Sequence, residues 1–262
     1  MKKSVMKMVL AGMIVLAGSS ALSAKSKKSE IDKIKKAGVL KVGCKEDVPG
    51  YGYLNPATGK HEGLEIEIAK AVSVKIFGKE SVKFTGVTAK TRGPLVDTGE
   101  IDMVAATFTV TDERRKLWDF STIYMHDPVA LMVKKASGIA SFKDLDGKTI
   151  GVAQAATSQK IFDAAAKELG ITVKFNSYSS YPEIKTALDS GRIDAFGVDS
   201  SILAGYMEDT VALLPERYAP QQYGIAVKKG NTALLEVIDE TIAEMEKSGE
   251  LAKIKAKYNL DK

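Results

Sequence analysis

The sequence predicts an α/β protein whose sheets are mostly parallel. Short runs of apolar and β-branched residues recur along the chain, and amphipathic helical patterns lie between several of them. Regular alternation of strands and helices is typical of parallel sheets covered by helices. With 262 residues, of which 45% are hydrophobic and 27% charged, the chain is long enough for a substantial core and for one or two domains.

The first element is a predicted secretory signal peptide at 1–24. Lysines precede an apolar run from Met8 to Leu16, and small residues follow as far as Ala24. The apolar run is short for a membrane span, so a retained anchor is the less favoured interpretation. Cleavage is expected near Ala24, although Leu22 stands where a small residue is preferred and leaves a neighbouring bond open. We therefore expect a mature chain in the periplasm.

Removal of this segment changes the charge balance. The full chain has 38 basic and 33 acidic residues, and the loss of three lysines leaves 35 against 33, or +2. No basic stripe is interleaved with aromatic residues, so no nucleic-acid partner is expected. The only cysteine, Cys44, follows an apolar strand and is expected to be a buried thiol. His61 and His126 lack ligand spacing, so neither a metal nor another cofactor is expected.

The mature chain begins with a short helix that leads into a strand, "IDKIKKAGVLKVGC" at 31–44. The segment "GLEIEIAKAVSVKIFG" at 63–78 allows two interpretations. It can alternate as a strand, or it can form a helix, because Ala69, Val72 and Ile76 repeat at helical spacing and the closing glycine suits a C-cap.

The remaining elements continue the alternation. Helical patterns such as "TSQKIFDAAAKELG" and "YPEIKTALDSG" separate the later strands, and the C-terminus is two amphipathic helices broken at Ser248 and Gly249. The predicted strands are 82–87, 102–108, 129–134, 149–153, 172–176, 195–199 and 223–228.

Three of these strands end in polar side chains. In open α/β sheets, ligands bind beyond the carboxyl ends of the strands. A hydroxyl-rich turn followed by a helix occurs twice, at 107–111 and 153–158, and two such turns facing each other would form a cleft. The polar residues are Thr107, Thr109 and Arg114 at or just beyond the end of the predicted strand 102–108, Thr157 and Ser158 after 149–153, and Asp199 at the end of 195–199.

Together these groups are complementary to a free amino acid. A guanidinium can hold a carboxylate through two parallel hydrogen bonds, and a helix N-terminus favours the same anion. A carboxylate such as Asp199 suits an ammonium group. Each residue alone also has an ordinary explanation, since threonine is a good strand residue, Arg114 can be solvated and Asp199 can cap a helix. Only their combination at three strand ends favours a site.

Several segments resemble, in order, the polar-amino-acid-binding proteins of bacterial ABC importers, known as solute-binding protein family 3. They are "GVLKVGCKEDVPGYGYLNPATGKHEGLEIEIAKAV", "TFTVTDERRKLWDFSTIYMHDPVALMVKK", "SFKDLDGKTIGVAQAATSQK", "AFGVDSSILAGY" and "PQQYGIAVKKG". Within the family the chain looks most like the aspartate and glutamate binders, because it has Lys45 in "GCKEDVP" and Arg92 in "TAKTRGPL".

The resemblance implies the two-lobed type II periplasmic binding protein fold. The first lobe would hold 25–122 and 224–262, and the second 128–218. Two short hinge crossings would lie at 123–127 and 219–223.

The resemblance also implies a role for each site residue. Arg114 would pair with the ligand α-carboxylate, joined by Thr109 and by Thr157 from the facing helix start. Asp199 would accept the α-ammonium, with Thr107 as a further acceptor.

Lys45 and Arg92 would take the side-chain carboxylate. With Arg114 these make three cations against one anion, Asp199, and this balance favours an acidic ligand over a neutral one. Trp118 and Phe120 are expected to pack under the turn rather than to touch ligand. We expect a non-enzymatic monomer that captures aspartate or glutamate by hinge closure and delivers it to an inner-membrane ABC permease.

Two alternatives stay open. The same fold could bind a neutral polar amino acid such as glutamine, asparagine or cysteine. It could also be a periplasmic dehydratase-like enzyme, which would need a proton donor or acceptor in the cleft, and the sequence offers only Asp199 as an obvious acid on the second lobe. An additional role as adhesin or sensor would leave the pocket unchanged.

Overall fold

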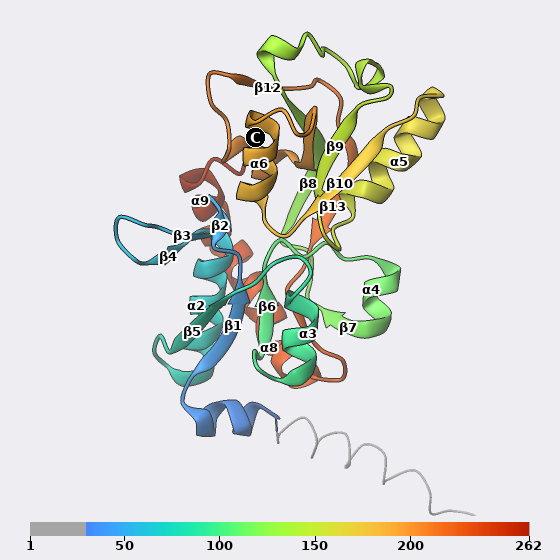
Figure 1. Ribbon diagram of the computed structural model, residues 1–262. Helices are drawn as coiled ribbons and strands as arrows, with labels where there is room; N and C mark the ends of the chain where they lie inside the picture. Colours follow the sequence, from blue (N-terminus) through green and yellow to red (C-terminus); the bar gives the residue numbers. More distant parts are fainter. Residues whose placement is uncertain (1–29, 262) are drawn as a thin grey trace, which may run out of the picture.

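A computed structural model describes residues 30–261, so the predicted signal peptide lies outside the described residues. The chain forms two sheet-containing lobes, one above the other in Figure 1. The first-lobe sheet has the order β5-β1-β6-β14-β7, with β1 at Leu40–Cys44, β5 at Val82–Gly86, β6 at Met103–Ala105, β7 at Trp118–Phe120 and β14 at Ala226–Lys228. The second-lobe sheet has the order β10 (Lys174–Tyr178), β9 (Thr149–Ala153), β11 (Ala195–Asp199), β8 (Met125–Lys134) and β12 (Val211–Leu213), and β13 (Tyr218–Tyr223) also pairs with β8.

Both sheets are mixed rather than purely parallel. In the first lobe β1 pairs in parallel with β5 and β6, whereas β14 is antiparallel to β6 and β7. In the second lobe β9 is parallel to β10 and β11, whereas β8 is antiparallel to its three partners.

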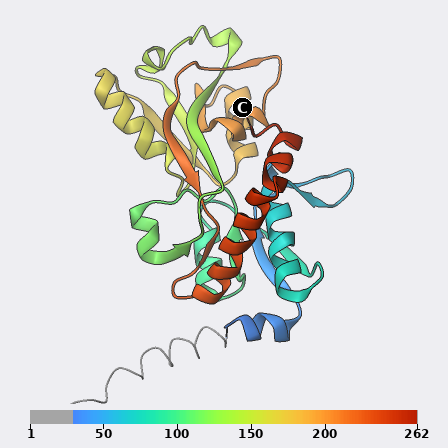
Figure 2. The same cartoon turned by 180° about the vertical axis from the view of Figure 1, so that it is seen from behind.

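Helices cover the sheets of both lobes. In the first lobe they are α2 (Leu64–Phe77), α3 (Arg92–Thr98), α4 (Asp112–Leu117), α8 (Thr232–Lys247) and α9 (Glu250–Lys257). Seen from behind in Figure 2, α8 and α9 run along this lobe beside α2, which both contact. The second lobe carries α5 (Ser158–Leu169), α6 (Tyr181–Asp189), α7 (Ser200–Ala204) and two 3-10 turns, η1 (Lys135–Ser137) and η2 (Phe142–Leu145).

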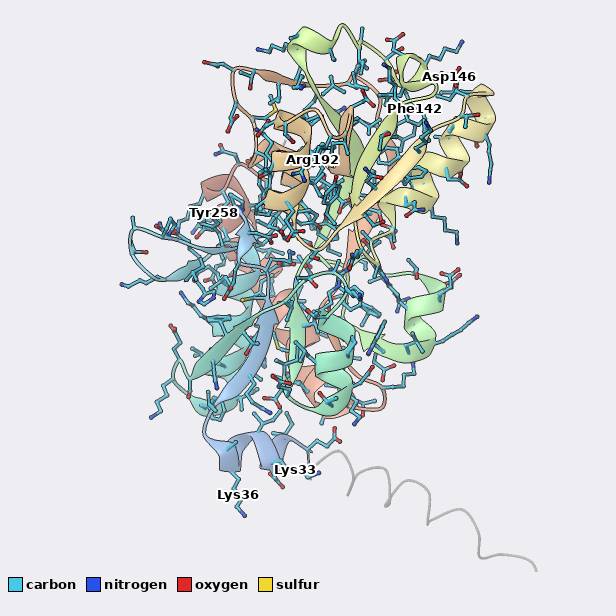
Figure 3. The ribbon with its side chains drawn as sticks, in the orientation of Figure 1. Lys33, Lys36, Phe142, Asp146, Arg192 and Tyr258 are labelled. Atoms are coloured by element: carbon cyan, nitrogen blue, oxygen red, sulfur yellow. The ribbon has the colours of Figure 1, made fainter. Side chains whose placement is uncertain are left out.

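The first ambiguity of the sequence is resolved in favour of the helix. Residues 64–77 form α2, and Gly78 ends it in the left-handed conformation, with φ of 72°. Residues 30–37 are also helical, and Lys33 and Lys36 extend from that segment at the end of the first lobe that lies away from the second (Figure 3). The basic N-terminal helix therefore contributes no charge to the strand ends discussed below.

Some elements were not predicted. A small antiparallel sheet of β2 (Asp47–Val48), β3 (Gly52–Leu54) and β4 (His61–Glu62) occupies a region that was left without strands. Trp118 and Phe120 pack against Phe108, with ring centroids 5.4 and 5.1 Å away, as expected for residues under the turn. The prediction was incomplete, because they also form β7 at the edge of the sheet.

The two predicted crossings lie side by side as antiparallel strands. In the β8–β13 pairing, Asp127 is opposite Gln221 and Met125 is opposite Tyr223. The first-lobe sheet takes its strands from three parts of the chain: β1 at 40–44, β5 to β7 within 82–120, and β14 at 226–228. All strands of the second-lobe sheet lie between these parts, within 125–223. That these crossings act as a hinge, and that the lobes have the expected bounds, stay predictions.

Candidate functional site

The two hydroxyl-rich turns face each other across the lobes, as predicted. Arg114, in the first turn of α4, donates from Nη1 to the carbonyl of Thr109 at 2.7 Å and from Nη2 to the carbonyl of Ala155 at 3.0 Å. Ala155 follows β9 of the second lobe. Thr107 and Ala155 both have left-handed backbones, with φ of 44° and 60°. Non-glycine residues in that conformation are uncommon and concentrate at functional sites.

The two arginines share one aromatic platform. The Arg92 guanidinium lies 3.9 Å from the centroid of the Phe108 ring, and that of Arg114 lies 4.9 Å from it. Arg92 is 3% exposed and donates from Nη1 to the carbonyls of Ala106 and Thr107, at 2.5 and 3.1 Å. Burial, more than the mutual repulsion of the two guanidinium groups, lowers the pKa of Arg114. Stacking on the negative face of a ring offsets part of this cost.

Asp199 ends β11 in a buried acidic surrounding. One of its oxygens, Oδ2, accepts a short hydrogen bond from the hydroxyl of Tyr223, which also donates to Asp127 at 3.3 Å. Burial first, and then the negative charge of Asp127, raise the pKa of Asp199 to about 7. A buried carboxyl with a raised pKa is stabilised in its ionised form by a nearby positive charge, so Asp199 favours a cationic partner.

Thr107 is held by a second buried acid. Its backbone N–H donates to Oε1 of Glu65 at 2.6 Å, and the Tyr124 hydroxyl donates to the same oxygen. Glu65 belongs to α2, and burial raises its pKa to about 7. This acid therefore fixes the left-handed turn that carries Thr107 and joins it to the segment entering β8.

Three buried polar atoms at these strand ends have no hydrogen-bond partner among residues 30–261. They are Nε of Arg92, Oγ1 of Thr107 and Oδ1 of Asp199. A buried polar group without a partner costs about 1–3 kcal/mol. These two donors and one acceptor could form hydrogen bonds with a bound polar ligand, which would remove that cost.

Lys45 is placed near these groups but is already paired. Its Nζ lies 2.9 Å from Oδ1 of Asp47 and 4.6 Å from the centroid of the Tyr181 ring. Burial and the charge of Asp199 raise the pKa of Tyr181. The nearby Arg92 opposes this shift but does not cancel it. Lys45 thus lies over the Tyr181 ring, and Arg92, Arg114 and Asp199 are near enough for their charges to interact with the Tyr181 side chain.

The expected charge balance of three cations and one anion is wrong. Asp47 offsets Lys45, Glu65 lies close enough to Arg92 to affect its pKa, and Asp127, at the predicted crossing in β8, adds a buried carboxylate that raises the pKa of Asp199. Asp199 therefore has a second buried acid close to it, which sequence reasoning did not count because Asp127 lies in the predicted crossing. The shortage of cleft acids therefore no longer argues against an enzyme.

Thr157 and Thr109 lie at the site with different partners. The Thr157 hydroxyl donates to Oε1 of Gln221 at 2.7 Å, so it is directed to the crossing strand β13 and makes no cap for α5. Thr109 is 7% exposed and bridges Tyr223 through its backbone. Both are near the facing turns, as predicted, and their roles toward a ligand stay predictions.

Sequence reasoning missed five residues of this region, and some left a signal. Asp47 comes two positions after Lys45, so an extended chain places both on one side. Glu65 is flanked by Leu64 and Ile66 in a helix whose apolar positions surround it. The missed residues are Asp47, which pairs with Lys45, and the buried residues Glu65, Phe108, Asp127 and Tyr181.

Two general features bear on the class of protein. Within residues 30–261, no helix combines the length and the apolar character needed to cross a membrane. In the same part of the chain, no group of histidine, cysteine and acidic side chains has the arrangement of a metal site.

The chain belongs to family 3 of the bacterial extracellular solute-binding proteins, whose model matches residues 40–261. It is 36% identical to the ABC transporter glutamine-binding protein GlnH of Bacillus subtilis (strain 168) over 90% of this chain and 86% of that one. It is 38% identical to the glutamine-binding protein of Geobacillus stearothermophilus, over 81% of each chain. It is 32% identical to the L-glutamate/L-aspartate-binding protein of Pseudomonas aeruginosa, over 87% and 79%.

Solved structures agree with this membership. An ancestral arginine-binding protein bound to arginine superposes with a TM-score of 0.76 at 35% identity, over 84% of this chain and 98% of that one. The ancestral amino-acid-binding protein AncCDT-1, described as a precursor of cyclohexadienyl dehydratase, gives 0.78 at 30% identity, over 87% and 99%. The two-lobed type II fold is therefore confirmed, and the chain is an amino-acid-binding component of the ABC importer class.

Proposed function

We propose that this protein captures a free α-amino acid between its lobes and delivers it to an ABC permease. The observation that carries the proposal is that Arg114 and Asp199 come one from each lobe, that each influences the pKa of the other, and that Oδ1 of Asp199 has no hydrogen-bond partner among residues 30–261. Arg114 would exchange its carbonyl partners for the ligand carboxylate, and Asp199 would accept the ammonium. Charge-assisted contacts of this kind contribute about 1.5–3 kcal/mol each when sheltered from water.

We propose further that the ligand side chain is acidic, as in aspartate or glutamate. The Arg92 guanidinium supports this, because it is buried, stacked on Phe108 and has an Nε with no partner among the described residues. A carboxylate would satisfy that donor and neutralise a charge that burial makes costly. Three of the more distant relatives carry names for glutamate and aspartate binding.

Glutamine is the second candidate, and the comparisons favour it. The two relatives named for glutamine are 36% and 38% identical, above the 28–32% of those named for glutamate and aspartate. The Lys45–Asp47 pair supports the same candidate, since it offsets one of the cations that a second carboxylate would need. A carboxamide could still accept from Arg92 through its oxygen.

Transport would proceed by hinge closure outside the cytoplasm. Each lobe holds part of the site, so the ligand favours the closed arrangement by its additional contacts there. The crossing strands β8 and β13 would be the hinge, and the closed shape would be recognised by the permease. The predicted signal peptide would direct the chain to the periplasm.

A thermal-shift screen of the mature chain against the common amino acids tests this function. A micromolar ligand at millimolar concentration should stabilise the folded state by about 4 kcal/mol. We expect the largest shifts with aspartate and glutamate, and titration calorimetry would rank these against glutamine and asparagine. A larger shift with glutamine than with glutamate would replace the acidic assignment, and no shift with any amino acid would overturn the proposed function.

A further inference from the structure

Asp47 joins the candidate ligand site to the opposite lobe. In β2 of the first lobe, its Oδ1 lies 2.9 Å from Nζ of Lys45. Its Oδ2 accepts from the backbone N–H of Tyr181 at 3.3 Å, and its own carbonyl accepts from the hydroxyl of Tyr206. Tyr181 and Tyr206 both belong to the second lobe. Asp47 is therefore a point where the lobes meet and where a candidate ligand-binding cation is neutralised.

The contact with Lys45 is ionic in character. The ammonium is within ion-pair distance of Oδ1 of Asp47, and this carboxylate opposes the lowering of the Lys45 pKa that burial causes. The Lys45 side chain is 3% exposed and that of Asp47 is 19% exposed. A buried ammonium needs a counter-charge, and Asp47 supplies it from the same protein. The ligand then meets a lysine whose charge is already offset.

The neighbouring acid is oriented differently. Glu46 pairs with His61 at 2.8 Å, and its side chain is 40% exposed. Two adjacent carboxylates thus have distinct surroundings: that of Asp47 contacts Tyr181 of the second lobe, and that of Glu46 contacts His61 and is partly exposed. Glu46 provides a matched control for the loss of one negative charge at this part of the chain.

We propose that Asp47 is a specificity-determining residue: as the internal counter-ion of Lys45, it lowers the preference of the site for a carboxylate over a carboxamide side chain. The proposal rests on the proposed function. When Asp47 is charged, a ligand carboxylate gains little from Lys45 and is repelled by the aspartate. When Asp47 is neutral, Lys45 needs a partner, and a ligand carboxylate supplies one whereas a carboxamide does not.

The test is a set of four proteins titrated with matched ligand pairs. Wild type, Asp47→Asn, Lys45→Met and the double variant are titrated calorimetrically with glutamate and glutamine, and then with aspartate and asparagine. Asp47→Asn should raise the affinity for the acid relative to its amide by about tenfold, as removal of a close like charge does. In the Lys45→Met background the same substitution should change that ratio far less. Glu46→Gln should leave the ratio unchanged.

The outcomes separate this proposal from the proposed function. If wild type binds amino acids and Asp47→Asn weakens acid and amide equally, Asp47 only helps the lobes to close and the proposal fails. It also fails if the ratio changes as much without Lys45 as with it. If Asp47→Asn does not fold by circular dichroism, Asp47→Ser, whose hydroxyl can still accept from the Tyr181 N–H, must show the same change of ratio. If wild type binds no amino acid, the proposed function itself has failed.

Discussion

A single phenyl ring organises the charges of the candidate site. Phe108 lies beneath both Arg92 and Arg114, so two guanidinium groups that repel each other are held on one platform. Arg92 is further fixed by the carbonyls of Ala106 and Thr107, which leaves Nε for another acceptor. Rotation of the Arg92 side chain to another conformation would break these contacts. Arg92 is therefore a rigid donor whose partner is selected by position and charge.

Arg92→Met should reduce binding of glutamate and aspartate by about 100-fold, which corresponds to the loss of one buried charge-assisted contact of about 2–3 kcal/mol. The loss for glutamine should be smaller, because its carboxamide carries no charge to be left unpaired. Titration calorimetry with the matched acid and amide measures both values.

Arg115→Met is the control for this substitution. Arg115 lies next to Arg114 on α4 and is exposed, so its removal lowers the net charge by the same amount without touching the cleft. Binding by this variant should equal that of wild type. Undiminished binding of glutamate by Arg92→Met would contradict the assignment of Arg92 to the ligand side chain.

The residues that sequence reasoning found are those that follow a strand. Thr107, Arg114 and Asp199 could be placed because the ends of strands in an α/β fold meet at one edge. Asp47 and Glu65 could not, because an acid near a helix start or a turn is usually solvated. Glu65 is placed by its contact with the left-handed turn at Thr107, and Asp47 by Lys45 and by Tyr181 of the second lobe. The local signals around these two acids do not specify such tertiary contacts.

At the scale of elements, the start of α2 links the small sheet to the site. Gly63 precedes the helix with φ of 130° and ψ of 170°, a conformation that essentially only glycine adopts. A Cβ there would lie 2.2 Å from the carbonyl oxygen of Tyr51. The N–H of Glu65 donates to that same carbonyl. The close approach at Gly63 thus places Glu65 where it can hold Thr107.

Gly63→Ala should therefore lower the free energy of unfolding by about 3 kcal/mol or more, since backbone strain and a clash with the main chain add. Urea denaturation measures this loss. Gly138→Ala is the matched control, because Gly138 also has a positive φ, of 72°, but a Cβ there meets no atom within 4 Å among the described residues. Gly138→Ala should lower the free energy of unfolding by only about 1 kcal/mol, which is the cost of the left-handed backbone alone. Equal losses for the two variants would contradict the argument.

The pattern of strands and helices was more predictable than their pairing. Runs such as 149–153 and 195–199 became β9 and β11 with the predicted bounds, because apolar β-rich segments between helices have few other solutions. The short strands β2, β3 and β4 have two or three residues each and carry no periodicity to detect. β13, at Tyr218–Tyr223, includes a proline and is recognisable only through its pairing with β8.

At the scale of the whole molecule, each lobe contributes a buried acid to the region of the candidate site. Glu65 comes from the first lobe and Asp199 from the second, and burial raises the pKa of each to about 7. In the unfolded chain such carboxyls titrate near pH 4. The folded, unliganded protein therefore favours their protonated forms. Its stability from these groups is fully present below about pH 4 and is lost as the pH rises to about 7.

Ligand binding should have the opposite dependence on pH. An ammonium group needs Asp199 in its ionised form, so affinity should fall by about thirtyfold between about pH 8.5 and about pH 5.5, given a pKa of about 7 in the unliganded protein. The ligand's own carboxylates stay ionised throughout this range, so the change reports on the protein. Titration calorimetry in two buffers of different ionisation enthalpy should detect release of nearly one proton per ligand near pH 6. Asp199→Asn should bind weakly and without this slope, whereas a wild-type affinity that is constant from about pH 5.5 to about pH 8.5 would show that Asp199 does not receive the ammonium.

The same rise in pH weakens the unliganded fold and strengthens ligand binding. The melting temperature of the unliganded protein should therefore fall with pH, while the difference between the liganded and unliganded melting temperatures grows. That difference should grow more steeply with pH than the melting temperature of the liganded protein.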